Sequence, residues 1–88
     1  MPRYRKKPLV VEACKYQAEL GNNRIADWLV SHNVSIKGWW FPDGEIIIST
    51  PEGNMKVRDG DWIIIGIKGE CYPCKDEIFT MTYDPMDY

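Results

Sequence analysis

Residues 7–17 have an alternating pattern, in which one set of positions is apolar and the other set contains both apolar and polar residues. Positions 9, 11 and 13 are all apolar, and the intervening set also contains Val10. Because successive side chains of a strand point to opposite faces, this pattern predicts a strand that is covered on one face and partly on the other. Pro8 has no amide proton, so it belongs at the start of this strand or on a sheet edge.

A helix is predicted after the break at residues 21–23. Asn23 suits the N-cap because its side-chain oxygen can accept an amide proton of the first turn. The following residues form an apolar stripe at i, i+3, i+4 and i+7: Ile25, Trp28, Leu29 and His32. Such a stripe must dock on a sheet. Asn33 tolerates positive φ and is expected to end the helix after about ten residues.

From residue 36 onward, turn residues separate short apolar segments about every 8–12 positions, as in a small antiparallel sheet. We expect one helical turn at 75–79 and a last strand at 80–83. The other predicted strands are 38–41, 45–49, 55–57, 62–67 and 70–73.

Together these elements predict an α+β fold: a small curved antiparallel sheet or partly open barrel of five to six strands, with one short helix packed on it. Alternation along 62–67 predicts that Trp62 and Ile64 share a core with Trp28 and Leu29. No repeat or linker divides the chain, so residues 1–88 are expected to form a single domain, with residues 1–6 as a candidate flexible basic arm.

The composition adds a heavy aromatic load. Four Trp, five Tyr and two Phe in 88 residues can build a core without a metal or disulfide framework. No run of about 18 apolar residues occurs, which predicts no transmembrane helix and no membrane partner. No signal peptide is readable either, so we expect a cytoplasmic protein.

Charge is unevenly distributed around a net value of −2. Residues 1–24 contain six basic residues and two acidic ones, whereas residues 76–88 contain four acidic residues and no basic one. The basic segment could meet nucleic acid or an acidic partner. It could equally be a solvated arm, or pair with the acidic C-terminal segment. The pI of about 5.3 favours these last two interpretations, since basic nucleic-acid domains usually exceed about 9.

Candidate chemistry is sparse. Cys71 and Cys74 have CxxC spacing, and with Cys14 and His32 they could supply four zinc ligands if all converged. Pro73 opposes the helix that a redox CxxC normally opens, so we interpret the thiols as packed in or beside a core. Neither His32 nor the turn carboxylates Asp59, Asp61, Glu52 and Glu70 form a credible catalytic set. The sequence therefore predicts a protein that is not an enzyme and that binds no metal and no cofactor.

The aromatic pair Trp39-Trp40 is more suggestive of function. Neighbouring residues of a strand point to opposite faces, so at least one ring is expected to point away from the core, unless the helix covers the second face. An exposed Trp surrounded by Lys37, Lys56 and Arg58 would suit a protein interface or a stacking platform for single-stranded nucleic acid.

Three segments resemble a widespread family of small phage and prophage proteins: RKKPLVVEA, TPEGNMKVRDGDWIIIGIKGE and CYPCKDEIFTMTY. The family pattern has an aromatic residue where this chain has Cys71, which argues against a metal or redox site common to the family. The resemblance implies a phage or prophage gene expressed in a bacterial cytoplasm, and it implies no activity.

Two function classes follow. The first is a non-enzymatic phage accessory protein that binds a host or defence-system protein, in an anti-defence or host-takeover role. The alternative is a small nucleic-acid- or nucleotide-binding module that uses the basic arm and an aromatic sheet face. The residues expected to carry binding in either case are Trp39, Trp40, Lys37, Lys56 and Arg58.

Overall fold

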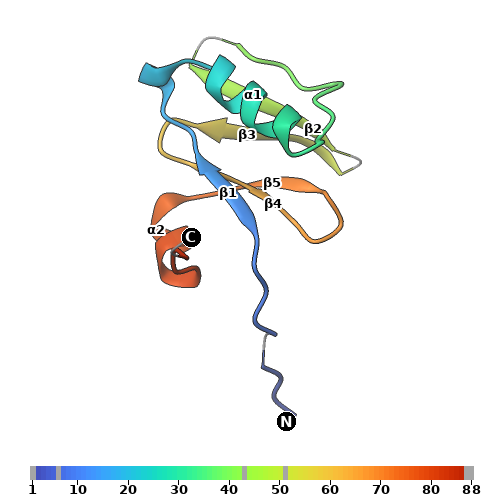
Figure 1. Ribbon diagram of the computed structural model, residues 1–88, viewed down its shortest axis with the longest axis vertical. Helices are drawn as coiled ribbons and strands as arrows, with labels where there is room; N and C mark the ends of the chain where they lie inside the picture. Colours follow the sequence, from blue (N-terminus) through green and yellow to red (C-terminus); the bar gives the residue numbers. More distant parts are fainter. Residues whose placement is uncertain (1, 6, 43, 51, 87–88) are drawn as a thin grey trace.

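A computed structural model describes residues 2–5, 7–42, 44–50 and 52–86. It contains two antiparallel sheets and two α-helices (Figure 1). One sheet has the strand order β1-β4-β5, formed by β1 (Glu12–Lys15), β4 (Trp62–Ile65) and β5 (Cys71–Cys74). The other is the hairpin of β2 (Glu45–Thr50) and β3 (Gly53–Arg58). The sheets do not close into a barrel, which confirms the predicted curved α+β fold.

Helix α1 (Asn23–Ser31) follows a short 3-10 turn, Ala18–Leu20, and covers the hairpin (Figure 1). It begins at Asn23, with Asn22 at the N-cap position that we expected for Asn23. The Asn22 side chain does not cap the helix; its Oδ1 accepts a 2.8 Å hydrogen bond from the Tyr16 hydroxyl. Asn33 has φ 61°, which confirms its predicted role after the helix end.

The core lies between α1 and the two sheets. Ile25 and Leu29 of the predicted stripe are fully buried in it and Trp28 packs against it, whereas His32 is exposed. The other buried members of this cluster are Tyr16, Ile46, Ile48, Val57 and Ile63.

The prediction that Trp62 and Ile64 are the core-facing residues of β4 is wrong. Ile63 and Ile65 point to the core with Leu29, whereas Trp62 packs on the opposite side of the sheet, against Phe79. The segment Trp62–Ile65 is apolar throughout and sandwiched between two layers. Its sequence therefore carries no alternation that would distinguish one face from the other.

Two other elements differ from expectation. The predicted strand at 38–41 reduces to one bridge between Trp40 and Ile47, because the Trp39 amide donates to the Ile36 carbonyl in a turn that includes Gly38 at φ 86°. The predicted strand at 80–83 is wrong. Residues 76–82 instead form helix α2 (Asp76–Thr82), whose first turn carries two acids that favour a helix N-terminus.

The first strand is also shorter than predicted. β1 pairs with β4 only from Glu12 to Lys15, since β4 ends at Ile65 and the chain then turns, with the Gly66 amide donating to the Glu70 carbonyl. Residues 2–5 and 7–11 run on past the end of the sheet as an arm (Figure 1). Within the described ranges, neither helix is long and apolar enough to cross a bilayer.

Candidate binding face

The outer face of the β2–β3 hairpin brings together most of the predicted binding residues. Ile47 pairs with Lys56 across the hairpin, and Trp40 pairs with Ile47 on its other side. Directly paired residues of antiparallel strands project to the same face, so these three side chains form one row across the sheet. The next row on this face pairs Glu45 with Arg58. We call this set the hairpin face: Trp40, Glu45, Ile47, Lys56 and Arg58.

The hairpin face has an apolar centre with a charged border. Trp40 is 66% exposed, whereas Ile47 is only 8% exposed although it points away from the α1 core. Arg58 Nε lies 3.5 Å from a carboxylate oxygen of Glu45, and the exposed Lys56 has no ion pair among the described residues. Two cations and one carboxylate therefore give the face a net positive charge.

Trp39 lies on the opposite side of the chain from Trp40. Its ring packs against the core and tilts towards Phe41 with centroids 6.4 Å apart. It also lines a cavity of about 340 Å³ at the open end between the two sheets. The prediction that the two rings separate is confirmed, and Trp40 is the outward one.

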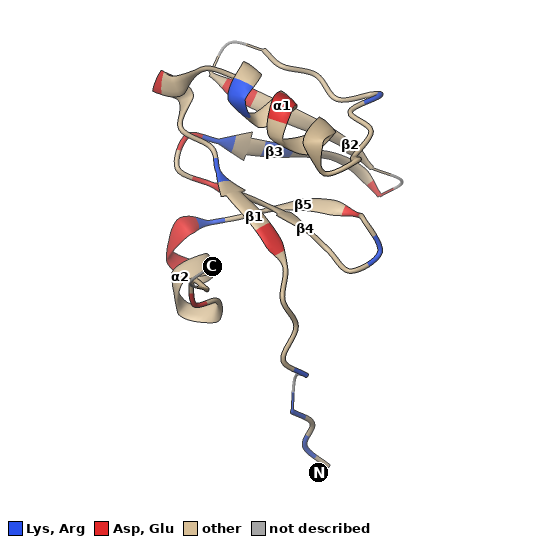
Figure 2. Cartoon of the chain, viewed as in Figure 1, with Lys and Arg blue, Asp and Glu red and all other residues tan. Residues whose placement is uncertain are grey.

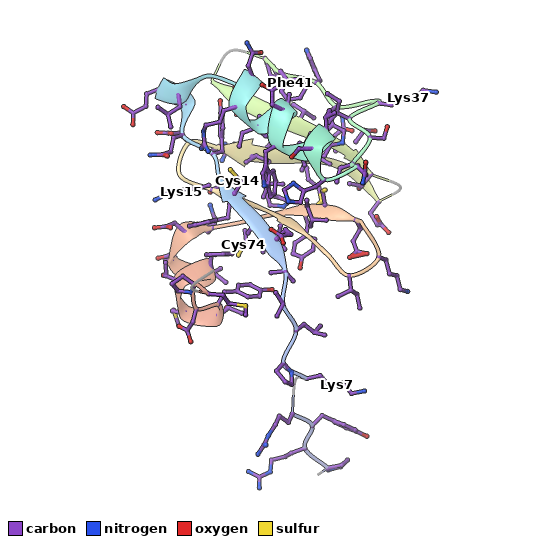
Figure 3. The ribbon with its side chains drawn as sticks, viewed as in Figure 1. Lys7, Cys14, Lys15, Lys37, Phe41 and Cys74 are labelled. Atoms are coloured by element: carbon purple, nitrogen blue, oxygen red, sulfur yellow. The ribbon has the colours of Figure 1, made fainter. Side chains whose placement is uncertain are left out.

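Lys37 lies in the loop before β2 and outside the two rows. Its side chain is exposed and projects from that loop (Figure 3). Sequence reasoning missed Ile47 and Glu45, although hairpin pairing could have revealed Glu45 as the partner of Arg58.

The three cysteines do not all share a face. Cys14 and Cys71 pack against the core, and Cys14 accepts a 3.3 Å hydrogen bond from Arg24 Nη1, whereas Cys74 is on the other face of the β1-β4-β5 sheet (Figure 3). Cys71 and Cys74 are three residues apart on one strand, so their side chains point in opposite directions. Among the described residues, no group of three or more His, Cys, Asp or Glu side chains could hold a metal ion.

Burial raises the pKa of the Cys71 thiol, and the charge of Glu70 adds to that effect. Burial also raises the pKa of Cys74, with a further contribution from Asp61. Both shifts favour the thiol over the thiolate, which is the reactive and metal-binding form. This environment agrees with the packing interpretation of the CxxC.

His32 has a structural setting at the end of α1. Its Nδ1 lies 2.9 Å from the Trp28 carbonyl oxygen, and its Nε2 lies 3.6 Å from the Glu12 carboxylate. His32 thus contacts its own helix through one ring nitrogen and β1 through the other.

The acids of the β3–β4 turn accept hydrogen bonds from backbone amides. Asp59 Oδ1 accepts from the Ala18 amide at 2.9 Å, and Asp61 Oδ2 accepts from the Arg58 amide at 2.9 Å. Gly60 between them has φ 91°, a conformation that L residues rarely adopt.

No protein-family model matches the chain, and comparisons with curated proteins and with solved structures find no significant match.

Proposed function

We propose that this chain is a non-enzymatic phage or prophage protein that binds an acidic surface of a host or defence-system protein in the bacterial cytoplasm. The observation that carries the proposal is the hairpin face, where exposed Trp40 lies beside the covered Ile47 and is bordered by Lys56 and Arg58. Protein interfaces commonly combine an aromatic anchor with such a border. The phage setting rests on the sequence resemblance alone.

The charge of the face supports an acidic partner. Lys56 adds a cation, and Glu45 offsets only one of the two cations in the two rows. Proteins that bind single-stranded nucleic acid usually stack successive bases on several aromatic rings. One exposed Trp is a small stacking surface by comparison. These features favour a protein over a nucleic acid at this face.

The test begins with capture of partners from a bacterial host lysate by the wild-type chain. The purified partner is then titrated against wild type and Trp40→Ala. We expect Trp40→Ala to weaken binding by about 30-fold or more, as for a central aromatic anchor, and Lys56→Ala to weaken it less.

Leu20→Ala is the matched control, because Leu20 is also an exposed apolar residue but lies outside the hairpin face. A partner that binds Trp40→Ala as tightly as wild type would exclude the hairpin face. Salt-dependent retention on heparin, abolished by Lys56→Ala and Arg58→Ala together, would instead support nucleic-acid binding.

A further inference from the structure

The N-terminal arm carries positive charge that the rest of the fold does not neutralise. Figure 2 shows basic residues along the arm, past the end of the sheets, and acidic residues at the start of α2. Arg3, Arg5 and Lys7 are exposed, and none of them forms an ion pair or a hydrogen bond with another described residue. The described residues therefore show no pairing between the arm and the acidic C-terminal segment.

The net charge of the chain conceals a division between the arm and the body. Residues 1–11 contain four of the 11 basic residues and no acidic one. Residues 12–88 contain the other seven basic residues and all 13 acidic ones, a net charge of −6. The pI of about 5.3 is thus an average over two oppositely charged parts. A polyanion is attracted to the arm, whereas the charge of the body as a whole repels it.

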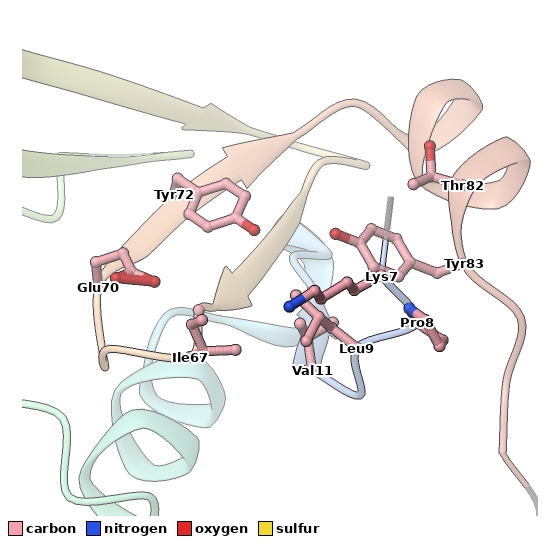
Figure 4. Close-up of a pocket in the computed structure, with 10 residues that line it drawn as sticks. Lys7, Pro8, Leu9, Val11, Ile67, Glu70, Tyr72, Thr82 and Tyr83 are labelled. Carbon is pink, nitrogen blue, oxygen red and sulfur yellow. The ribbon is translucent and has the colours of Figure 1, made fainter. Parts of the chain in front are cut away.

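The base of the arm is fixed against the body. A pocket of about 390 Å³ opens where the arm meets the end of α2, and both Leu9 and Tyr83 line it (Figure 4). Lys7 lines the same pocket together with Glu70, so the charge of Lys7 is partly offset there. Residues 2–5 lie further out, at the far end of the chain from the sheets (Figure 1). Arg3 and Arg5 are therefore the cations of the arm that are most accessible to a large ligand.

These two arginines flank an uncovered aromatic ring, because Tyr4 is 92% exposed. In an extended chain alternate residues point to the same side and are about 6.6 Å apart. Phosphates follow one another about every 3.4 Å along a stacked nucleic-acid strand, so Arg3 and Arg5 match alternate phosphates. The acidic groups of a protein surface have no such regular repeat. A guanidinium group binds phosphate bidentately, and a tyrosine ring can stack on a base.

We propose that the segment Arg3-Tyr4-Arg5 binds single-stranded nucleic acid, with the two arginines on phosphates and Tyr4 stacked on one base. Lys7 adds a weaker phosphate contact at the base of the arm. The segment uses no residue of the hairpin face and lies at the other end of the molecule (Figure 1), so this site is additional to the proposed protein interface. With two or three phosphate contacts, the affinity is modest and falls as salt is added.

The experiment measures binding of the purified full chain to a fluorescent oligothymidylate by anisotropy. The oligonucleotide has about 12 nucleotides, and salt is varied from about 20 to 200 mM. We expect the logarithm of the association constant to fall with the logarithm of salt concentration with a slope of about −1.4 to −2, since each phosphate contact contributes about −0.7. The double variant Arg3→Ala/Arg5→Ala is expected to lose about 1.4 of that slope.

Tyr4→Ala tests the stacked base separately. It is expected to weaken binding by about fivefold or more at every salt concentration and to leave the slope unchanged, because the ring carries no charge. Lys75→Ala is the matched control for Arg5→Ala, since Lys75 is an exposed cation on the body and its loss changes the net charge equally. The arm side chains are exposed, so these variants should keep the wild-type circular dichroism spectrum.

Several results would overturn the proposal. These are a wild-type chain that does not bind the oligonucleotide at about 20 mM salt, and binding that Arg3→Ala/Arg5→Ala leaves unchanged. A duplex of the same length bound as tightly as the single strand would exclude single-strand recognition. Polyglutamate that competes as strongly as the oligonucleotide would exclude phosphate recognition. Trp40→Ala and Lys56→Ala/Arg58→Ala should bind the oligonucleotide as wild type does, so the outcome is independent of the proposed function.

Discussion

The two helices of this small protein are attached to their sheets in different ways. Helix α1 places Ile25 and Leu29 in a core where both side chains are fully buried. Helix α2 lies on the other face of the β1-β4-β5 sheet and has no buried side chain. Figure 1 shows the two helices on opposite sides of the β1-β4-β5 sheet.

Helix α2 is held by a few directional contacts. The Phe79 ring stacks on Trp62 with centroids 3.9 Å apart and planes 10° apart, and the Trp62 indole N–H donates to Asp76 Oδ1 at 2.8 Å. Apolar burial of the α1 kind is non-directional and independent of pH, whereas the Asp76 contact is stronger when the carboxylate is charged. The two helices should therefore respond differently to side-chain truncation and to acid.

The largest effect is expected from Leu29→Ala. Truncation of a fully buried Leu removes apolar burial and leaves a cavity, which lowers the free energy of unfolding by about 2–5 kcal/mol. Val30→Ala is the control, since this neighbouring side chain is exposed, and it should change stability little. Urea denaturation measures the free energy of unfolding of both variants. A loss below about 1 kcal/mol for Leu29→Ala would contradict the buried position of α1.

Phe79→Ala is expected to have a smaller and more local effect. It removes the stack on Trp62 from a half-buried site, and we expect a loss of about 1–2 kcal/mol. Amide hydrogen exchange should accelerate in α2 and stay unchanged in α1. Ile78→Ala is the control on the exposed side of the same helix. Equal acceleration in both helices would mean that they unfold as one unit.

The difference between the helices also explains which parts of the fold were predictable. The α1 stripe contrasts with polar neighbours at helical spacing, so residues 25–32 were sufficient to predict both the helix and its buried face. Segment 80–83 is rich in Thr and Tyr, which favour strands locally. Its helical state depends on Phe79 reaching Trp62, a contact 17 residues away in sequence that no local pattern contains.

The same reasoning applies to the candidate site. The opposite orientations of Trp39 and Trp40 were predicted from strand alternation and are observed, although Trp39 lies in a turn after Ile36 and only Trp40 bridges to β2. The position of Ile47 beside Trp40 depends on register between segments joined by a turn, and the run Ile46-Ile47-Ile48 hides which residue points outward. The pocket between the arm and α2 was not predictable, because it depends on the helix continuing past the predicted turn at 75–79.

Asp76→Asn is expected to give the smallest effect, visible mainly in its pH dependence. The hydrogen bond from Trp62, and secondarily the Lys15 ammonium 3.5 Å away, hold the pKa of the Asp76 carboxyl below its ordinary value. A carboxyl with a lowered pKa in the folded state contributes stability that is present above its unfolded pKa of about 3.9 and is lost as the pH falls through its folded pKa.

The measurement is the free energy of unfolding of wild type and Asp76→Asn across this pH range. Asn keeps an acceptor oxygen for Trp62 but not the charge. Wild type should therefore be the more stable protein at neutral pH, and the difference should disappear in acid. Glu77→Gln is the matched control, because it removes a charge from the same first turn without touching the Trp62 contact. A difference between wild type and Asp76→Asn that is the same at neutral and acidic pH would show that the charge of Asp76 does not hold α2 in place.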